Sequence, residues 1–158
     1  MTEIYLETFI LAPVEICFNL ARSIDLHKIS LEHTNEKAVD GRTSGLIEKG
    51  EFVTWRAKHF GINQTLSVKI AEMNSPDYFC DEMIKGSFKT MRHEHFFEPE
   101  EKGTLMTDKF FYEVPFSIFG KVFDALVLEN YMKRLLQSRN QTIKRVAESG
   151  EWRKIINQ

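Results

Sequence analysis

Two histidines near the middle of the chain have the spacing that a β-strand needs to bring their side chains to one face. In the stretch MRHEHFFE, residues 91–98, His93 and His95 alternate with charged residues and share their side with Met91 and Phe97. Successive side chains of a strand point to opposite faces. Because the other side of this stretch carries three formal charges, we expect it to face solvent and the two imidazoles to face the protein interior.

An aspartate in the next strand-like run is expected on the same interior face. Residues 104–114 alternate, and the more apolar side of this run carries Asp108 together with Tyr112. A short turn before this run makes the two strands antiparallel, and two registers keep their interior faces together. One register pairs Asp108 with His93 and the other pairs it with His95. In either case a carboxylate lies opposite an imidazole, within reach of a cross-strand contact.

A carboxylate and two imidazoles inside a protein need polar partners. An unpaired buried charge costs several kcal/mol, and an unpartnered buried polar group costs about 2 kcal/mol. The hydroxyl of Tyr112 is one available partner. Asp81 is another, because Phe79 and Met83 share its side of the run 78–84. These groups predict a short polar line across an otherwise apolar interior.

A polar line between apolar walls suits the binding of an amphipathic small molecule. Interior aromatic residues would supply the apolar contact, among them Trp55, which shares its side with Val53 and Ala57. The residues that we predict to contact a ligand are Trp55, Phe79, Asp81, His93, His95, Asp108, Phe110, Tyr112, Phe123 and Tyr131. The same polar groups can also form a satisfied buried network, with or without ordered water, that binds no ligand.

A metal site is a further alternative for these residues. His93 and His95, with Asp108 opposite, can offer three ligands to one ion. A His-x-His pair is common, however, and the aspartate can satisfy both rings without a metal. The glycine-rich fingerprints GxGxxG and GxxxxGK[ST] do not occur. We therefore expect neither a metal nor another cofactor.

The elements that must position these groups are strands separated by glycine and proline. The strand-like runs are residues 3–11, 51–60, 62–73, 78–84, 87–98 and 104–114, with weaker runs near 35–39 and 44–48. Short connections between consecutive runs predict antiparallel hairpins. His59, at the end of one run, and His33 are expected at the surface or in loops.

Two short helices and one long helix complete the expected elements. Pro13 and Glu15 mark the start of the first short helix, and Ser23 can cap a second that ends near Ile29. A long helix is predicted from about Ser117 to Glu148. Its apolar stripe consists of Phe119, Val122, Phe123, Leu126, Val127, Tyr131, Leu135 and Ile143. An antiparallel sheet must bury its apolar face, and this helix is large enough to cover it.

Length and charge narrow the class of protein. The 158 residues fit one domain, which we place at residues 1–150 and which a C-terminal tail follows at 151–158. The net charge of −2 and the dispersed basic residues predict no nucleic-acid partner. We see neither a secretory signal nor an uncharged run long enough to span a bilayer. Cys17 and Cys80 have no metal-binding spacing, and we expect buried thiols in a cytoplasmic protein.

Four stretches in this order carry a resemblance to a known superfamily. They are LETFILAPVEICFNLARSIDLHKIS, GEFVTWRAKHFGINQTLSVKI, PDYFCDEMIKGSFKTMRHEHFF and GTLMTDKFFYEVPFSIFGK. With the long closing helix, they resemble the SRPBCC superfamily over residues 3–148. This superfamily comprises START-like and polyketide-cyclase-like helix-grip proteins and includes the birch-pollen allergen, and small bacterial members are most similar. The resemblance implies an α+β helix-grip fold. In this fold a curved, seven-stranded antiparallel sheet wraps on the C-terminal helix, two short helices follow the first strand, and a hydrophobic cavity lies between sheet and helix.

The resemblance also implies a range of functions. Members bind lipids, sterols, polyketides, plant hormones or aromatic compounds, some are cyclases or dehydratases, and some act as cochaperones. We expect a carrier or sensor of an apolar or amphipathic small molecule. The alternative is a cyclase or dehydratase in which His93 or His95, oriented by Asp108, transfers protons and Tyr112 donates to an oxyanion. No partner surface is evident in the sequence, so a protein-interaction module ranks below both.

Overall fold

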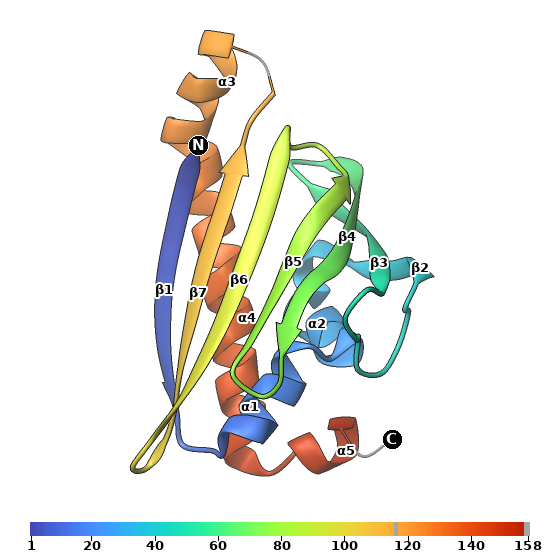
Figure 1. Cartoon of the computed structure of the whole chain (residues 1–158). Helices are drawn as coiled ribbons and strands as arrows, with labels where there is room; N and C mark the ends of the chain where they lie inside the picture. Colours follow the sequence, from blue (N-terminus) through green and yellow to red (C-terminus); the bar gives the residue numbers. More distant parts are fainter. Residues whose placement is uncertain (116, 157–158) are drawn as a thin grey trace.

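A curved antiparallel sheet wraps around a long C-terminal helical segment, which confirms the predicted α+β helix-grip architecture (Figure 1). The computed structural model describes residues 1–115 and 117–156, without the side chains of residues 117–119. In this described part of the chain, no helix combines the length and the apolar character needed to cross a membrane.

Seven strands form one sheet, in the order β1-β7-β6-β5-β4-β3-β2. All neighbouring strands pair antiparallel. The strands are β1 (Thr2–Ile10), β2 (Lys37–Gly41), β3 (Phe52–His59), β4 (Ile62–Asn74), β5 (Tyr78–Lys85), β6 (Thr90–Glu100) and β7 (Gly103–Glu113). The weak run near 35–39 corresponds to β2. The weak run at 44–48 was predicted wrongly as a strand, because its pairing is limited to an isolated bridge between Ser23 and Leu46.

The register of the sheet decides which side chains meet. β6 and β7 pair with His95 opposite Asp108, which is the second of the two registers left open by the sequence. β5 and β6 pair with Asp81 opposite His93 and with Phe79 opposite His95. Along the middle of β6, buried residues alternate with half-buried ones, and both histidines belong to the buried set. The predicted inward direction of the two imidazoles is therefore confirmed.

The helices follow the predicted order with one interruption. They are α1 (Val14–Ala21), α2 (Ile24–Ser30), the 3-10 helix η1 (Glu32–Thr34), α3 (Ser117–Phe123), the π-helical turn η2 (Asp124–Leu128), α4 (Glu129–Ser149) and α5 (Trp152–Ile156). The long helix was predicted to be regular, but η2 divides it. The tail after residue 150 carries α5, while residues 157–158 lie outside the described part.

Local signals explain where the helices begin and end. Ser23 precedes α2, and its side-chain oxygen accepts a hydrogen bond from the backbone N–H of Leu26, as expected of an N-cap. Pro13 precedes α1, where its fixed φ and missing N–H are tolerated. Gly150 ends α4 with a φ of +77°, a left-handed conformation that glycine adopts without steric cost.

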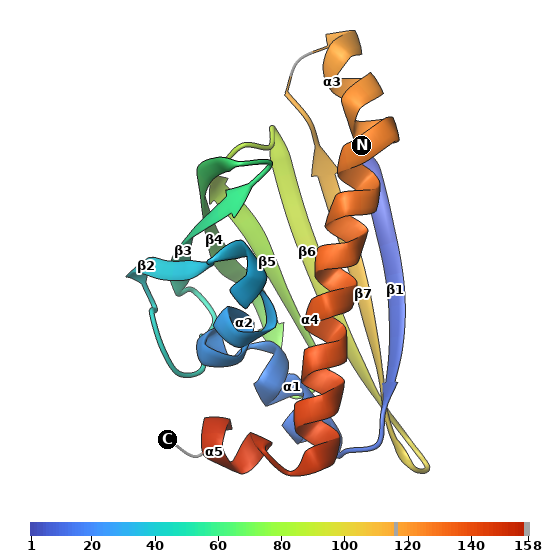
Figure 2. The same ribbon diagram turned by 180° about the vertical axis from the view of Figure 1, so that it is seen from behind.

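The helix α4 lies along the inner side of the sheet, beside α1 and α2 (Figure 2). Its buried residues Leu136, Ile143 and Val146 join the hydrophobic core. The N-terminal part of the predicted stripe behaves differently, because α3 extends beyond the ends of the strands (Figure 1). The side chains exposed there are Val122, Phe123, Leu126 and Val127. Val122, Leu126 and Val127 are therefore not part of the predicted core, whereas Phe123, which was predicted to contact a ligand, lines the cavity. The side chain of Phe119, also in the predicted stripe, lies outside the described part.

Candidate ligand-binding cavity

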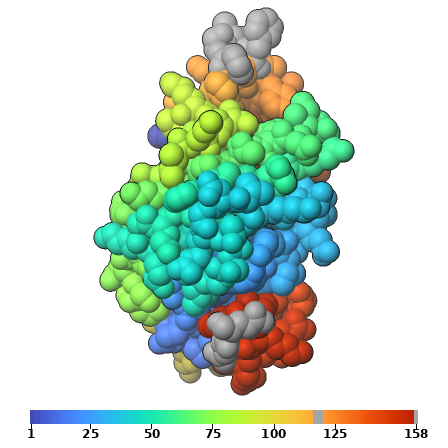
Figure 3. All heavy atoms as spheres, turned by 90° about the vertical axis from the view of Figure 1, so that its right-hand side faces the viewer, coloured from blue at the N-terminus to red at the C-terminus, as the bar shows by residue number. Residues whose placement is uncertain are grey.

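A cavity of about 450 Å³ lies between the inner face of the sheet and the helical segment. Its walls are mostly apolar, with contributions from β3, β4, β5, β7 and α4, for example Val53, Val68, Phe79, Phe110 and Leu136. Figure 3 shows the outer surface of the molecule on the side of β2 and β3. On this side the β2–β3 segment forms a continuous surface below the connection between β3 and β4. The volume falls within the range of about 300–1,000 Å³ that is usual for small-molecule sites.

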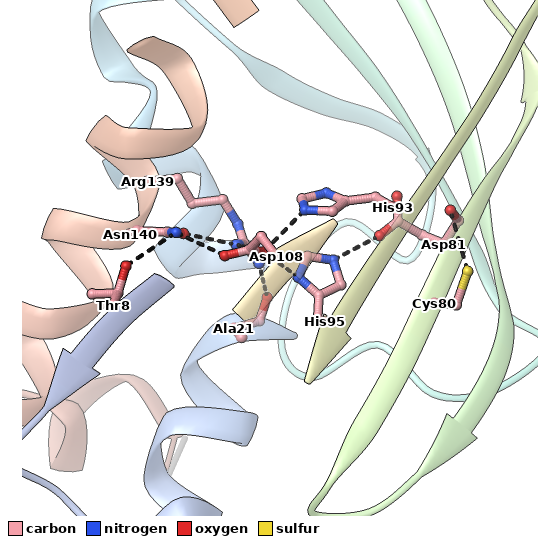
Figure 4. Close-up of polar contacts among 9 residues, drawn as sticks. All are labelled: Thr8, Ala21, Cys80, Asp81, His93, His95, Asp108, Arg139 and Asn140. Carbon is pink, nitrogen blue, oxygen red and sulfur yellow. Dashed lines mark hydrogen bonds and ion pairs between the residues drawn. The ribbon is translucent and has the colours of Figure 1, made fainter. Parts of the chain in front are cut away.

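One end of the cavity is polar and is built around Asp108, which is fully buried. Its Oδ1 atom lies 2.9 Å from Nε2 of His93 and 2.8 Å from Nδ1 of His95. Its Oδ2 atom accepts a hydrogen bond of 2.7 Å from the side-chain amide of Asn140 on α4 (Figure 4). The carboxylate therefore connects two strands of the sheet to the helix that the sheet grips.

Two further charged groups extend this network. Nε2 of His95 lies 3.0 Å from Oδ1 of Asp81, which confirms that Asp81 joins the histidines. The guanidinium of Arg139 lies 3.6 Å from Asp108 and donates a hydrogen bond of 2.9 Å to the carbonyl oxygen of Ala21. Figure 4 shows the resulting line, with Asp108 on one side of the two rings and Asp81 on the other.

Burial and neighbouring charges shift the pKa values of this network. Burial, with the nearby His95 ring adding to it, lowers the pKa of His93 to about 4, so that His93 is neutral at pH 7. Burial acts to raise the pKa of Asp108, but hydrogen bonds from both imidazoles outweigh it and hold that pKa well below its ordinary value. For Asp81 as well, burial acts to raise the pKa, but the 3.0 Å contact with His95 outweighs it and lowers that pKa. Both carboxylates are therefore ionised.

Two predicted contacts lie elsewhere. Tyr112 is fully buried and does not line the cavity, because its hydroxyl donates to Asp124 on η2. The prediction that this hydroxyl joins the histidines was wrong. Asp108 also does not line the cavity itself, whereas the two imidazoles that contact its carboxylate do. Asp108 can orient the groups that meet a ligand, but it does not face the ligand itself.

The other predicted contacts do line the cavity. They are Trp55, Phe79, Asp81, His93, His95, Phe110, Phe123 and Tyr131. Phe123 is 45% exposed and meets the ring of Phe60 edge-on at 5.6 Å, so these two mark a rim. Tyr131 hydrogen-bonds Nδ1 of His59 at 2.8 Å. His59 is half-buried and lines the cavity, so its predicted surface position was wrong.

Sequence reasoning missed three polar residues of the cavity region. Asn140 had a signal, since it lies four residues after Leu136 and three before Ile143 and so interrupts the apolar stripe. Arg139 had a signal as well, since it lies four residues after Leu135 and four before Ile143 and so falls within the predicted stripe. Glu36 lines the cavity, and among the described residues none donates a hydrogen bond to its Oε2 atom; the 3.3 Å contact with His27 lacks hydrogen-bond geometry.

Comparison with known proteins gives matches in structure alone. No family model matches the chain, and no curated protein matches it by sequence. The protein TTHA0849 from Thermus thermophilus superposes with a TM-score of 0.70 at 21% identity, over 90% of this chain and 97% of that one. Protein SA2116 from Staphylococcus aureus, whose function is described as unknown, has a TM-score of 0.70 at 13% identity, with 95% of each chain covered.

Plant proteins have the same architecture. The ginseng major latex-like protein 151 from Panax ginseng superposes with a TM-score of 0.65 at 14% identity, over 92% of this chain and 97% of that one. The protein Ara h 8.0201 has the same TM-score at 12% identity, over 94% and 98%. Identities this low establish the fold alone. The chain therefore has the same helix-grip fold as these proteins.

Proposed function

We propose that this protein binds an apolar or amphipathic small molecule in the cavity between the sheet and α4. The observation that carries the proposal is a cavity of about 450 Å³ with apolar walls and one polar end. A void of this kind leaves apolar side chains without contacts on one side, and an apolar ligand restores those contacts. The hydrophobic effect then favours transfer of such a ligand out of water.

The polar groups of the cavity would orient the ligand. Asp81, His93 and Arg139 line one end, and Glu36 lies on another part of the wall. The Oε2 atom of Glu36, which accepts no hydrogen bond from the described residues, can accept one from a hydroxyl or amine. A ligand with an apolar body and a few polar substituents fits this arrangement better than a pure hydrocarbon, because buried polar groups without partners are costly.

The aromatic rim suggests the access route. Phe60 is 48% exposed, and its ring lies 4.6 Å from the ring of Tyr131 as well as beside Phe123. All three line the cavity. Phe60 lies in the turn between β3 and β4, while Phe123 ends α3, so the rim joins the sheet to the helical segment. A small separation of these rings would admit a ligand.

The enzymatic alternative has less support than binding. Its oxyanion donor was Tyr112, and that hydroxyl is engaged with Asp124 away from the cavity. The contacts of both imidazoles with Asp108 agree with the orienting role that this alternative gives to the aspartate, but without Tyr112 the alternative lacks its oxyanion donor. We therefore propose binding, as carrier or sensor, and no second function.

Tryptophan fluorescence can test both binding and its location. The chain has two tryptophans: Trp55 lines the cavity, whereas Trp152 lies on α5 outside its lining. A bromine-labelled medium-chain fatty acid quenches only a nearby indole. In Trp152→Phe, which retains Trp55, we expect saturable quenching. In the matched variant Trp55→Phe, which retains Trp152, we expect none.

Two results would count against the proposal. One is equal quenching in both variants, which would mean non-specific surface binding. The other is the absence of saturable binding both for the bromine-labelled acid and for lipid and metabolite extracts screened by native mass spectrometry. Mass spectrometry also identifies a retained ligand directly, because its mass adds to that of the protein.

A further inference from the structure

Three side chains at the polar end of the cavity form a set that suits a metal ion. One possible ligand atom from each of Asp81, His93 and His95 lies within 4.8 Å of the other two. All three residues line the cavity, and both histidines are buried. Two imidazoles and one carboxylate are a recurrent ligand set for first-row transition metals. We propose that Asp81, His93 and His95 form a binding site for a divalent transition-metal ion such as Zn²⁺.

Asp108 decides which ring nitrogens remain free to bind the ion. Its Oδ1 atom is the common acceptor for Nε2 of His93 and Nδ1 of His95, so both of those nitrogens carry protons. The nitrogens left to offer a lone pair are Nδ1 of His93 and Nε2 of His95. Metal-binding histidines characteristically donate their other N–H to a carboxylate, which orients the ring and increases its basicity. Here one buried carboxylate does this for two rings at once.

The contact between His95 and Asp81 also requires a positive centre. With its proton on Nδ1, an uncharged His95 would direct the lone pair of Nε2 at Oδ1 of Asp81, only 3.0 Å away. Two acceptors at this distance repel each other, so a proton or a metal ion must lie between them. Ligand atoms about 2.0–2.1 Å from one zinc ion are separated by about 2.9–3.4 Å. The observed separation of this pair lies in that range.

This ligand set differs from the one that the sequence suggested, and it is the reason to revise the expectation of no metal. The sequence placed Asp108 opposite the histidines as the third ligand. In the structure Asp108 lies behind both rings, and Asp81 on β5 lies on the cavity side (Figure 4). The third ligand therefore comes from a different strand, and Asp108 has the orienting role.

The chemistry of the site restricts the ion and its further ligand. Nitrogen donors disfavour Mg²⁺ and Ca²⁺, which take oxygen ligands almost exclusively. Three protein ligands leave at least one coordination position open, and all three of these residues line the cavity. An oxygen atom of a molecule in the cavity can complete the coordination. With the ion bound, the cavity would favour small molecules that carry a metal-coordinating head group. Binding of the ion itself does not depend on the proposed small-molecule function.

Metal titration tests the site without any organic ligand. Tag-free protein, dialysed against a chelator and then freed of it, is titrated with Zn²⁺ by calorimetry and with Co²⁺ by visible absorption. We expect one ion per chain. Asp81→Asn and His95→Gln should each weaken the affinity at least about 10-fold, since each removes a ligand. The matched controls Asp77→Asn and His33→Gln, at exposed positions, should leave the affinity unchanged.

Zinc X-ray absorption on the unmodified protein supplies a second readout that does not depend on variants folding. We expect two imidazoles in the coordination sphere at about 2.0–2.1 Å. The proposal is overturned by the absence of saturable one-to-one binding, by variants that bind like their controls, or by a zinc sphere with fewer than two imidazoles. A failure of the fluorescence test above leaves these outcomes unaffected, so the two proposals can fail separately.

Discussion

Replacing Asp108 by asparagine should destabilise the protein more than any other single isosteric change at the polar end. The carboxylate accepts three hydrogen bonds of 2.7–2.9 Å and is fully buried. In Asp108→Asn the shape is kept, but one oxygen becomes an NH₂ group. That NH₂ must face either the amide of Asn140 or the two imidazole N–H groups, so at least one donor is left opposite a donor.

The magnitude follows from the burial of the network. Breaking one partner of a buried charged network costs about 3–5 kcal/mol. For a chain of this length, each kcal/mol lowers the melting temperature by about 2–4 °C, which predicts a decrease of about 6–20 °C. Urea denaturation followed by circular dichroism measures the loss in the free energy of unfolding, provided that both arms of the transition are recorded.

An exposed carboxylate on a neighbouring strand gives the control. Glu98→Gln on β6 removes the same charge from a solvent-exposed position and should change the free energy of unfolding by less than about 0.5 kcal/mol. If Asp108→Asn lost less than about 1 kcal/mol, our view of Asp108 as the buried acceptor that joins β6, β7 and α4 would be refuted.

Three further outcomes are expected. Tyr112→Phe removes a hydrogen bond to a buried carboxylate, so urea denaturation should show that the free energy of unfolding falls by about 1.5–3 kcal/mol. Fatty-acid binding should be unchanged, and reduced binding would mean that this hydroxyl does contact the ligand. Phe60→Ala removes an aromatic contact with Phe123 that is worth about 0.5–1.5 kcal/mol, so stopped-flow measurements should show ligand dissociation about 2- to 12-fold faster. An unchanged dissociation rate would argue against this rim as the access route. Burial raises the pKa of the Cys17 thiol and raises that of the Cys80 thiol to about 12, so less thiolate forms at any given pH. At pH 8.5, iodoacetamide should therefore alkylate neither cysteine until urea is added. Rapid labelling of the folded protein, detected by mass spectrometry, would contradict their burial.

The direction of the histidines was predictable because strand periodicity is local. A period of two, with charges on one side and apolar residues on the other, leaves a single inward face for β6. The register between β6 and β7 was predictable only to within two residues, since shifts of two keep the same faces together. The structure selects the pairing of His95 with Asp108.

The partner of Tyr112 could not be predicted, for a different reason. Its hydroxyl contacts Asp124 on the helical segment instead of a residue of a neighbouring strand, and Asp124 is the first residue of the π-helical turn η2. Such a turn inserts one residue into a helical repeat and has no clear pattern of its own in a single sequence. The same turn precedes α4, so extrapolating one regular apolar stripe from α4 back to Val122 failed.

The cavity itself had only an indirect signal in the sequence. Apolar residues that fill a core and apolar residues that line a hollow have the same periodicity, and only their packing distinguishes them. The resemblance to helix-grip proteins supplied that expectation. The place of Glu36 in the cavity wall depends on how the loop before β2 lies against the helices, which side-chain patterns do not encode.

Enlarging a side chain inside the cavity is the most direct test of whether that space is an open ligand site. Ala57 on β3 is buried and lines the cavity, whereas the adjacent Lys58 faces solvent. In Ala57→Phe the new ring enters empty volume, so we expect the free energy of unfolding to change by less than about 1 kcal/mol and fatty-acid affinity to fall more than about 10-fold. Lys58→Phe should leave both unchanged. A loss of about 1–3 kcal/mol, as in an overpacked core, together with unchanged binding would contradict the account.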